Sequence, residues 1–365
     1  MTDLRTLAKI HCDPMSMRTE NGIPKDQAIL LGNSIVCDGY VSGKTTAVFT
    51  HFHDDHTWNF MSALRNCHNI LLTEPTYRAL KALQKFPERP SIQKLPYNLP
   101  FPTATGEIIE LIDANHVRGS CQILVTIENT GEKILYSGDF SFPEIPTPKA
   151  DVLVLDGTHG VPLYDFNTDK KSIMRRIFDT VCEQIENNRS VEILANRGTM
   201  QDIMAQLEKT ENGEFIAEDI PFLAEQNDVD LTNAIKYTYD EKIREIEIST
   251  NSRLNELYHD EKKPYIRFAR PGQGSMQQER TQIIQADVNP NYKTNGPFWS
   301  DKNGKIYACL AAHADYGNIL KYVKMIDPKL VIVDGTRANS EDSKSLANAI
   351  SKEFGIACYM ENCKP

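Results

Sequence analysis

Short apolar runs and tight turns alternate along the first part of the chain. Residues 29–31, 34–37 and 47–50 are apolar or β-branched, and Gly-Asn, Asp-Gly and Ser-Gly pairs separate or follow them. Residues 121–127 and 133–136 have the pattern of a hairpin closed by an Asn-Thr-Gly turn. This part of the chain therefore predicts a series of short strands.

Helical patterns follow some of these strands. Residues 58–65 and 75–84 have helical spacing, and each comes directly after a predicted strand or the loop that ends it. Strands and helices mixed in this way are typical of a layered α/β architecture. We therefore predict the α/β class.

The pattern changes in the middle of the chain and returns near its end. Residues 210–263 are rich in Glu, Asp and Lys with few apolar positions, which favours exposed helices. From residue 305 onward, short strands and helices alternate again. We predict one domain built from residues 1–162 and 304–365, interrupted by a smaller inserted domain at residues 163–303.

The composition is that of a globular protein, with 40% hydrophobic and 25% charged residues in 365. No apolar run approaches the roughly 20 residues that cross a bilayer, and the N-terminus lacks the apolar core of a signal peptide. We therefore expect a cytoplasmic protein with no membrane association. The net charge of −10 disfavours nucleic acid as a partner, because phosphate contacts come from clustered Lys and Arg, although a local basic groove is compatible with it.

Eight scattered cysteines form no C-x-x-C pair. Reduced thiols in a cytosolic protein explain them better than a disulfide scaffold. Cys358 and Cys363 have two interpretations. They form a disulfide bond or bind a metal together, or they are two thiols without a functional role, which is the simpler interpretation.

The most specific signal is an H-x-H-x-D-H motif directly after an apolar strand, formed by His51, His53, Asp55 and His56. Such a motif occurs by chance in roughly 10⁻³–10⁻⁴ of chains of this composition. Imidazole nitrogens with a carboxylate oxygen suit zinc. The alternative is a solvated cluster of loop histidines.

Two further strand ends carry residues of the same types. His116 follows the apolar residues 108–112, and Asp139 follows residues 134–136. Each alone is ordinary for a strand end or turn. Three strand ends that present His and Asp toward one rim predict a site for two metal ions about 3.5–4 Å apart.

These motifs, in order, resemble those of the metallo-β-lactamase superfamily. More narrowly, the chain resembles the β-CASP nucleases, which include Artemis, the DNA cross-link repair nucleases, ribonuclease J and the pre-mRNA 3′-end endonuclease. Residues 36–40, 113–116 and 137–140 look most like the Artemis and cross-link repair branch. The resemblance implies an αββα sandwich with an inserted, smaller α/β domain of the β-CASP type.

The resemblance also implies the metal ligands. His51, His53 and His116 would hold one zinc ion, Asp55 and His56 would hold the other, and Asp139 would bridge them. One or two Zn²⁺ ions are expected, with Mn²⁺ as a substitute.

Two residues match further family motifs, and a third departs from them. In the family that the chain resembles, Asp156 and His313 match an acid and a histidine that protonates the leaving oxygen. We therefore expect both residues to be catalytic, together with the metal ligand Asp55. The alternatives are that Asp156 is an ordinary strand-end carboxylate and His313 an ordinary core histidine. Asp334 stands where part of the family has histidine and the DNA branch has an apolar residue. It would either ligate the second zinc ion or cap its turn.

Candidate substrate contacts are weaker signals. Arg118 follows the His116 motif and suits a phosphate, although an ordinary surface arginine explains it equally well. Arg197 precedes a predicted helix near where relatives have a Gly-Arg pair. Gly272, Gly274 and Ser275 lie in a glycine-rich turn that suits a phosphate, but a plain loop is the simpler interpretation.

Three functions are compatible with these residues. The leading hypothesis is a zinc-dependent nuclease for DNA or RNA, in which the metal lowers the pKa of bound water from 15.7 to roughly 7. The second is a hydrolase of a small thioester or lactone, which the acidic net charge and Asp334 favour. The third is a non-enzymatic scaffold, which the intact ligand set disfavours.

Overall fold

The computed structural model describes residues 3–12, 27–166, 169–210, 215–273, 281–288 and 291–361. The chain forms two compact units. The first unit consists of Met1–Asp165 and His313–Pro365, and the second of Phe166–Ala312.

One sheet of the first unit has six strands in sequence order. They are β1 (Ala8–Cys12), β2 (Gln27–Leu31), β3 (Ile35–Cys37), β4 (Thr46–Val48), β5 (Asn69–Leu72) and β6 (Ile92–Lys94). The first three strands pair antiparallel, and β3 to β6 pair parallel.

The other sheet of this unit has seven strands in the order β20-β19-β11-β10-β9-β8-β7. They are β7 (Phe101–Pro102), β8 (Glu107–Asp113), β9 (Cys121–Ile127), β10 (Lys133–Tyr136), β11 (Val152–Asp156), β19 (Leu330–Asp334) and β20 (Ala357–Glu361). Here β11 pairs parallel with both β10 and β19, so the carboxyl ends of these strands share one edge of the sheet.

The sequence of β11 shows how the layers are held together. Val152 and Val154 lie in the apolar core that joins the two sheets, whereas Leu153 and Leu155 lie in a second core on the opposite face. Side chains alternate across a strand, so an uninterrupted apolar run indicates a strand that is buried on both faces.

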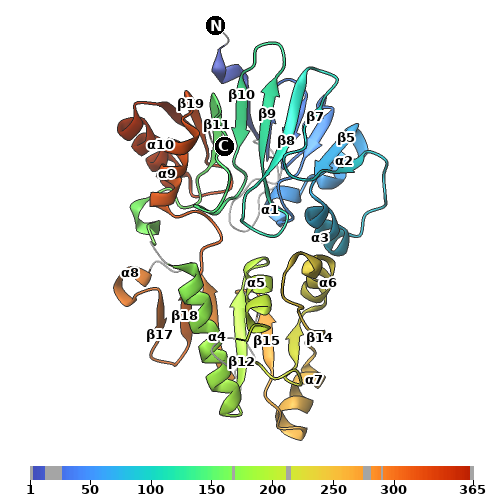
Figure 1. The fold of residues 1–365 in the computed structure, drawn as a ribbon, viewed down its shortest axis with the longest axis vertical. Helices are drawn as coiled ribbons and strands as arrows, with labels where there is room; N and C mark the ends of the chain where they lie inside the picture. Colours follow the sequence, from blue (N-terminus) through green and yellow to red (C-terminus); the bar gives the residue numbers. More distant parts are fainter. Residues whose placement is uncertain are drawn as a thin grey trace. The chain divides into compact units, whose positions relative to one another are not determined.

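Helices cover the outer faces of this unit. In the second core, α9 (Tyr316–Ile326) and α10 (Ser340–Phe354) pack on β11 and β19 (Figure 1). The first unit also contains α1 (Asp54–Thr57), α2 (Phe60–Asn66) and α3 (Glu74–Gln84). The Phe60 ring of α2 contacts Phe49, which follows β4, with 5.0 Å between ring centroids.

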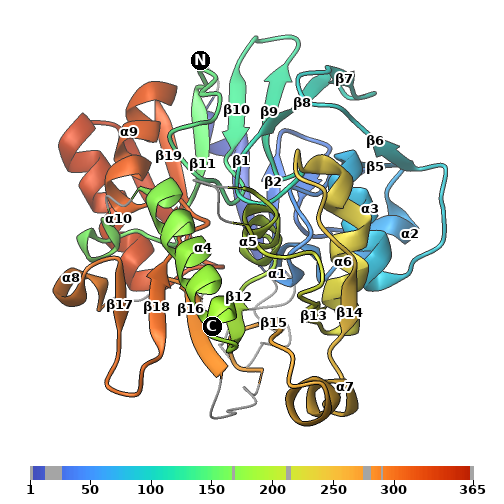
Figure 2. The ribbon, with the colours of Figure 1, turned by 60° about the horizontal axis from the view of Figure 1, so that its bottom comes forward.

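The second unit contains a seven-stranded sheet in the order β14-β13-β15-β12-β16-β18-β17, in which only β17 runs antiparallel to its neighbour. The strands are β12 (Ser190–Ala195), β13 (Phe222–Ala224), β14 (Ile246–Ile248), β15 (Ile266–Ala269), β16 (Thr281–Asp287), β17 (Phe298–Ser300) and β18 (Ile306–Cys309). The helices are α4 (Lys170–Glu186), α5 (Thr199–Leu207), α6 (Gln226–Ile235), α7 (Asn251–Asn255) and α8 (Tyr292–Asn295). Both α4 and α5 contact β12 (Figure 2).

These observations confirm the α/β class. The second unit begins at residue 166 and ends at 312, whereas the predicted insertion spans 163–303. At the carboxyl end, β18 lies beyond residue 303 and pairs with β16 in the sheet of the second unit. The charged residues 210–263, predicted to be exposed helices, also contain β13 and β14.

Cys358 is not disulfide-bonded, and Cys363, with which it was considered as a pair, lies outside the described residues. Cys12 is disulfide-bonded, which departs from the expectation that all thiols are reduced. Among the described residues, no helix is both long and apolar enough to cross a membrane.

Candidate metal centre

The loop after β4 brings two histidines of the first motif together. His51 is fully buried, and His53 occupies the N-cap position of α1 with extended backbone angles. The His51 Nε2 and His53 Nδ1 atoms are 3.0 Å apart, and His53 Nδ1 is 3.2 Å from Nε2 of His116. Three ring nitrogens thus converge from two distant parts of the chain.

Local backbone geometry explains why the third histidine reaches this point. His116 follows β8 after Asn115, whose φ of 48° turns the chain away from the strand direction. The His116 and Val117 amides donate to Oγ of buried Ser120, which fixes this loop. Asn is among the few residues that adopt such a conformation readily.

Asp139 reaches the same point through a glycine turn. Gly138 has a φ of 53°, and a Cβ there would lie 2.9 Å from Cγ2 of Thr50 and 3.0 Å from the Cys121 carbonyl oxygen. A side chain at residue 138 would therefore push the turn away from the first motif. The Oδ2 atom of Asp139 lies 3.6 Å from Nε2 of His51 and also of His116.

Ligand atoms of His51, His53, His116 and Asp139 all lie within 4.8 Å of one another, close enough to hold one metal ion. Burial lowers the pKa of His51 well below its usual value, and His56 and His53 lower it further. Burial alone would raise the pKa of Asp139, but His56 and His313 hold it well below its usual range. A neutral imidazole and an ionised carboxylate are the protonation states that bind a metal.

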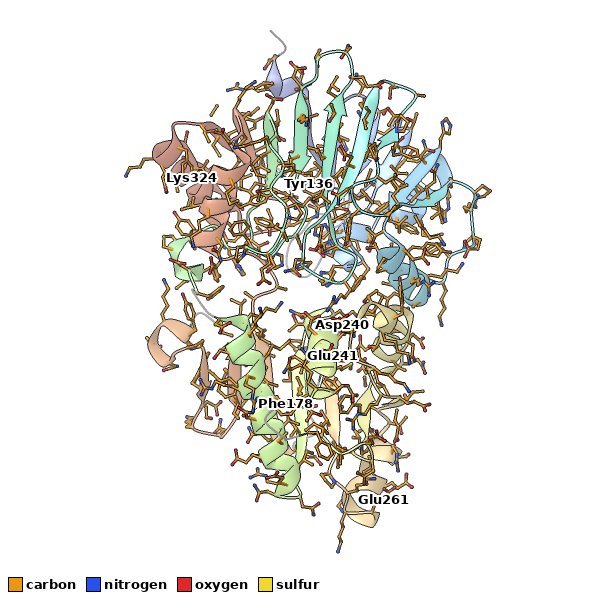
Figure 3. All side chains as sticks on the ribbon, viewed as in Figure 1. Tyr136, Phe178, Asp240, Glu241, Glu261 and Lys324 are labelled. Carbon is orange, nitrogen blue, oxygen red and sulfur yellow. The ribbon has the colours of Figure 1, made fainter. Side chains whose placement is uncertain are left out.

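His56 is oriented by Asp38, which our sequence interpretation did not identify as functional. The Asp38 Oδ2 atom accepts hydrogen bonds from His56 Nδ1 at 2.7 Å, Thr50 Oγ1 at 2.7 Å and the Tyr136 hydroxyl at 3.0 Å. Figure 3 shows Tyr136 inside the first unit. A carboxylate behind a ligating histidine is a common arrangement at metal sites, because it fixes the ring and its tautomer.

The other nitrogen of His56 faces two carboxylates. Its Nε2 atom lies 3.3 Å from Oδ1 of Asp139 and 3.7 Å from Oδ2 of Asp55, and it is buried without a hydrogen-bond partner. Burial would lower the pKa of His56, but Asp139, Asp55 and Asp38 together raise it well above its usual value. A buried nitrogen aimed at carboxylates and lacking a hydrogen bond fits a position that a cation occupies.

Asp156 and His313 form a second group beside the first. His313 Nδ1 lies 2.8 Å from Oδ2 of Asp156, and its Nε2 lies 3.7 Å from Oδ2 of Asp139. Burial would lower the pKa of His313, but Asp139 and Asp156 raise it to about 9. The backbone next to His313 is held because the Ala314 amide donates to the Phe140 carbonyl oxygen at 2.7 Å.

His159 is another residue of this region that sequence reasoning missed. Its Nδ1 donates to the Ala314 carbonyl oxygen at 3.0 Å, and its ring stacks on Tyr164 with 5.0 Å between centroids. Burial and then His313, whose ring centroid is 5.6 Å away, lower its pKa to about 4. The signal available in the sequence was its place three residues after Asp156.

The groups that could hold a metal ion among the described residues leave out the predicted ligands Asp55 and His56, and they leave out Asp334 as well. Its carboxylate accepts hydrogen bonds from the amide and hydroxyl of Thr336 and from Nη1 of Arg337. Of the two predicted roles, the turn cap is therefore the one with observed contacts.

The predicted substrate contacts have mixed positions. Arg118 is exposed two residues after His116. Arg197 belongs to the second unit, where its Nε donates to Oδ1 of buried Asp228 at 2.7 Å. Gly272 is exposed in the same unit, whereas Gly274 and Ser275 lie outside the described residues.

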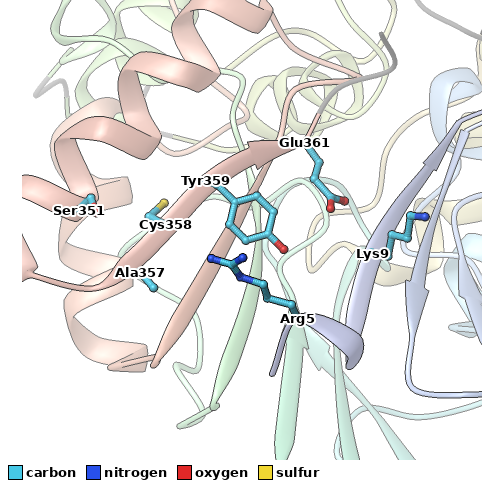
Figure 4. A pocket seen from close by; sticks show the side chains of 7 residues that line it. All are labelled: Arg5, Lys9, Ser351, Ala357, Cys358, Tyr359 and Glu361. Carbon is cyan, nitrogen blue, oxygen red and sulfur yellow. The ribbon is translucent and has the colours of Figure 1, made fainter. Parts of the chain in front are cut away.

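A cavity of about 630 Å³ lies elsewhere in the first unit (Figure 4). Arg5, Lys9 and Glu361 are among its lining residues, and none of the predicted site residues that the structure describes line it. It is therefore a feature separate from the histidine cluster.

Comparisons with known proteins give relatives for part of the chain. No family model matches it. An uncharacterized protein of Acidianus ambivalens, named for its place in the lig 3′ region, is 34% identical over 134 residues, which are 36% of this chain and 89% of that protein. At this identity and coverage, the chain belongs to the same family as the Acidianus ambivalens protein. The name of that protein states no activity.

Larger proteins match over stretches of similar length. The DNA cross-link repair 1A protein of Gallus gallus is 30% identical over 41% of this chain, and the cleavage and polyadenylation specificity factor subunit 3 of Dictyostelium discoideum is 29% identical over 30% of it. The matched segments are only 16% and 13% of those proteins. The chain is a distant homologue of both over part of its length.

A solved structure shares the fold over nearly the whole chain. It is a protein of unknown function from Enterococcus faecalis V583, with a TM-score of 0.57, 13% identity and coverage of 93% of this chain and 95% of that one. At this identity the likeness concerns the fold alone.

Proposed function

We propose that the chain is a metal-dependent nuclease of the β-CASP group within the metallo-β-lactamase superfamily. The observation that carries the proposal is that a metal-binding cluster and the Asp156–His313 pair lie side by side and share Asp139. The names of two distant relatives, which refer to DNA cross-link repair and to cleavage and polyadenylation, support nucleic acid as the substrate.

The residues present fit a divalent transition metal. Three ring nitrogens and one carboxylate oxygen within 4.8 Å of one another match the donors that zinc prefers, and Mn²⁺ is the expected substitute. The unpartnered Nε2 of His56 adds a further donor that faces Asp55 and Asp139. A bound ion would make water acidic enough to supply hydroxide at neutral pH.

In this proposal, His313 is the general acid. Its raised pKa keeps the ring protonated at neutral pH, and its Nδ1 is held by Asp156 while Nε2 faces the cluster. A proton held at Nε2 is available to the oxygen that leaves a cleaved phosphodiester, a contribution of typically about 10²–10⁴-fold in rate. Asp156 orients the ring and stabilises its charged form.

The substrate we propose is single-stranded DNA or RNA, cleaved by a 5′ exonuclease activity with some endonuclease activity. Exposed Arg118, two residues from His116, supplies a cation for a neighbouring phosphate. The net charge of −10 means that such contacts are local, so we expect cleavage to weaken steeply with added salt.

The test is cleavage of 5′-labelled single-stranded DNA and RNA by purified protein with Zn²⁺ or Mn²⁺. We expect cleavage by the wild type and by His68→Ala, which removes an exposed histidine, and none by His53→Ala. A circular single-stranded substrate separates the two modes, because only an endonuclease opens it. No cleavage by the wild type, or equal cleavage by His53→Ala, contradicts the proposal.

A second candidate is a small-molecule hydrolase on the same metal cluster, which the acidic net charge favours. Turnover of a thioester or lactone by the wild type, lost in His53→Ala and without nuclease activity, would select this candidate.

A further inference from the structure

Asp334 lies at the carboxyl end of β19, beside the end of β11 that carries Asp156. In the parallel register, Asp334 is opposite Asp156 on β11 and Glu361 on β20. An acidic residue in this place is within one strand of the cluster and has the right type to serve as an oxygen ligand. The contacts of its carboxylate therefore decide whether it is available to a metal.

Both oxygens of the Asp334 carboxylate accept hydrogen bonds from the turn that follows β19. Oδ1 accepts from the Thr336 amide at 2.8 Å and from the Thr336 hydroxyl at 2.6 Å, while Oδ2 accepts from Nη1 of Arg337 at 2.8 Å. The side chains of Asp334 and Arg337 are each only 6% exposed. Turning the carboxylate toward a metal would leave a buried guanidinium without its partner, which is strongly unfavourable.

Arg337 is also tied to the backbone of the metal motif. Its Nη2 donates to the Asp38 carbonyl oxygen at 2.9 Å, and its Nε donates to the Asp55 carbonyl oxygen at 3.3 Å. A guanidinium remains protonated in proteins, so Arg337 carries a permanent charge. A fixed positive charge thus lies next to the segment that carries Asp55 and His56.

The two predicted metal positions, one among His51, His53, His116 and Asp139 and the other beside Asp55 and His56, therefore differ in their protein ligands. His51, His53, His116 and Asp139 form a complete four-ligand group. On the other side, Nε2 of His56 faces Asp139 and the one-third exposed Asp55, and neither Asp55 nor His56 belongs to the groups that could hold a metal ion among the described residues.

We propose that the Arg337–Asp334 ion pair makes the centre unequal, with one tightly held divalent ion on the histidine side and a weak position beside Asp55 and His56. The inference rests on the metal centre of the proposed function and concerns its stoichiometry. The buried pair withholds the carboxylate of Asp334 as an oxygen ligand, and the missing ligand lowers the affinity for a second cation. Partners of this kind typically change metal affinity by about 10–100-fold.

The experiment is a zinc titration of metal-free, full-length protein against a chromogenic chelator. The wild type is expected to bind one ion tightly and a second at least about tenfold more weakly. Arg337→Met keeps the side-chain length, removes the charge and releases Asp334, so the second ion should bind roughly 10–100-fold more tightly. The double variant Arg337→Met/Asp334→Asn should return that ion to its wild-type affinity.

Asp334→Asn alone is the variant that keeps the test decisive if Arg337→Met does not fold. Because the inference gives Asp334 no contact with metal, this variant should bind both ions as the wild type does. Two ions of equal affinity in the wild type, or loss of one ion in Asp334→Asn, would overturn the inference and leave the nuclease proposal intact. A wild type that binds no zinc would overturn the proposed function as well.

Discussion

Asp38→Asn is expected to destabilise the first unit even without metal. Asp38 is buried, and its two oxygens accept four hydrogen bonds, from the Thr50 amide and hydroxyl, the Tyr136 hydroxyl and His56 Nδ1. Asparagine keeps the shape but has one acceptor oxygen. With that oxygen at the Oδ2 position, three bonds persist as uncharged ones, and the Thr50 amide then faces an NH₂ group.

The magnitude follows from these four bonds. An unsatisfied buried amide costs about 1–3 kcal/mol, and replacing a charged by a neutral acceptor costs about 0.5–1.5 kcal/mol per bond. Relief from burying the carboxylate charge offsets part of this loss. We expect the free energy of unfolding to fall by about 2–4 kcal/mol.

The assay is urea unfolding of metal-free protein followed by tryptophan fluorescence. The chain has two tryptophans, Trp58 in the first unit and Trp299 in the second, so a Trp299→Phe background makes the signal report the first unit. Asp54→Asn is the matched control, because Asp54 is exposed in the same motif, and it should change the free energy by at most about 0.5 kcal/mol. Equal stability of Asp38→Asn and the control would refute the reasoning.

Other perturbations test the remaining parts of the site and fold. His313 has a pKa of about 9 and acts as an acid when protonated, so the cleavage rate should decline as the pH rises through that value. Asp156→Asn removes the carboxylate that stabilises the charged ring, so the decline should move to lower pH. A pH-rate profile that does not move would argue against the role of the Asp156–His313 pair. Gly138→Ala should lower the zinc affinity and reduce the free energy of unfolding by about 1–3 kcal/mol, because the added Cβ would meet Thr50 and a backbone carbonyl oxygen. Unchanged zinc affinity would contradict the claim that the glycine turn positions Asp139. Leu346→Ala should cost about 2–5 kcal/mol, since Leu346 is fully buried between α10 and the sheet, and a loss below about 1 kcal/mol would place the helix elsewhere. Saturating zinc at about 1,000 times Kd should raise the free energy of unfolding by about 4 kcal/mol, reversed by a chelator.

The sequence was most informative where the chemistry is local. The H-x-H-x-D-H motif lies within six residues, so its residues are close in any fold. His116 and Asp139 required a further step, namely that each follows an apolar strand, and the structure brings both to His51. The four-residue group could therefore be anticipated from strand ends together with a family resemblance.

Partners far apart along the chain carried no such signal. Asp38 lies in an Asp-Gly turn that reads as an ordinary loop, and only the folded chain shows that its carboxylate contacts His56 and Tyr136. Asp334 was a candidate metal ligand because of its residue type. In the structure, the turn after β19 places Arg337 so that it donates a hydrogen bond to the Asp334 carboxylate. Residue type alone does not say which of several partners a carboxylate contacts.

For a related reason, the sequence does not show that the second unit extends to residue 312. The apolar residues of β18 predict a strand, but the sheet that a strand joins depends on long-range pairing. In the structure, β18 pairs with β16 of the second unit. The charged residues 210–263 hid the short β13 because three buried residues, Phe222 to Ala224, are too few to show a period.

Anomalous X-ray diffraction at the zinc absorption edge, on crystals grown with Zn²⁺, tests the central claim most directly. We predict a strong peak within about 2.0–2.2 Å of nitrogens of His51, His53 and His116 and of a carboxylate oxygen of Asp139. No peak among these residues, or zinc bound only elsewhere on the chain, would contradict the account.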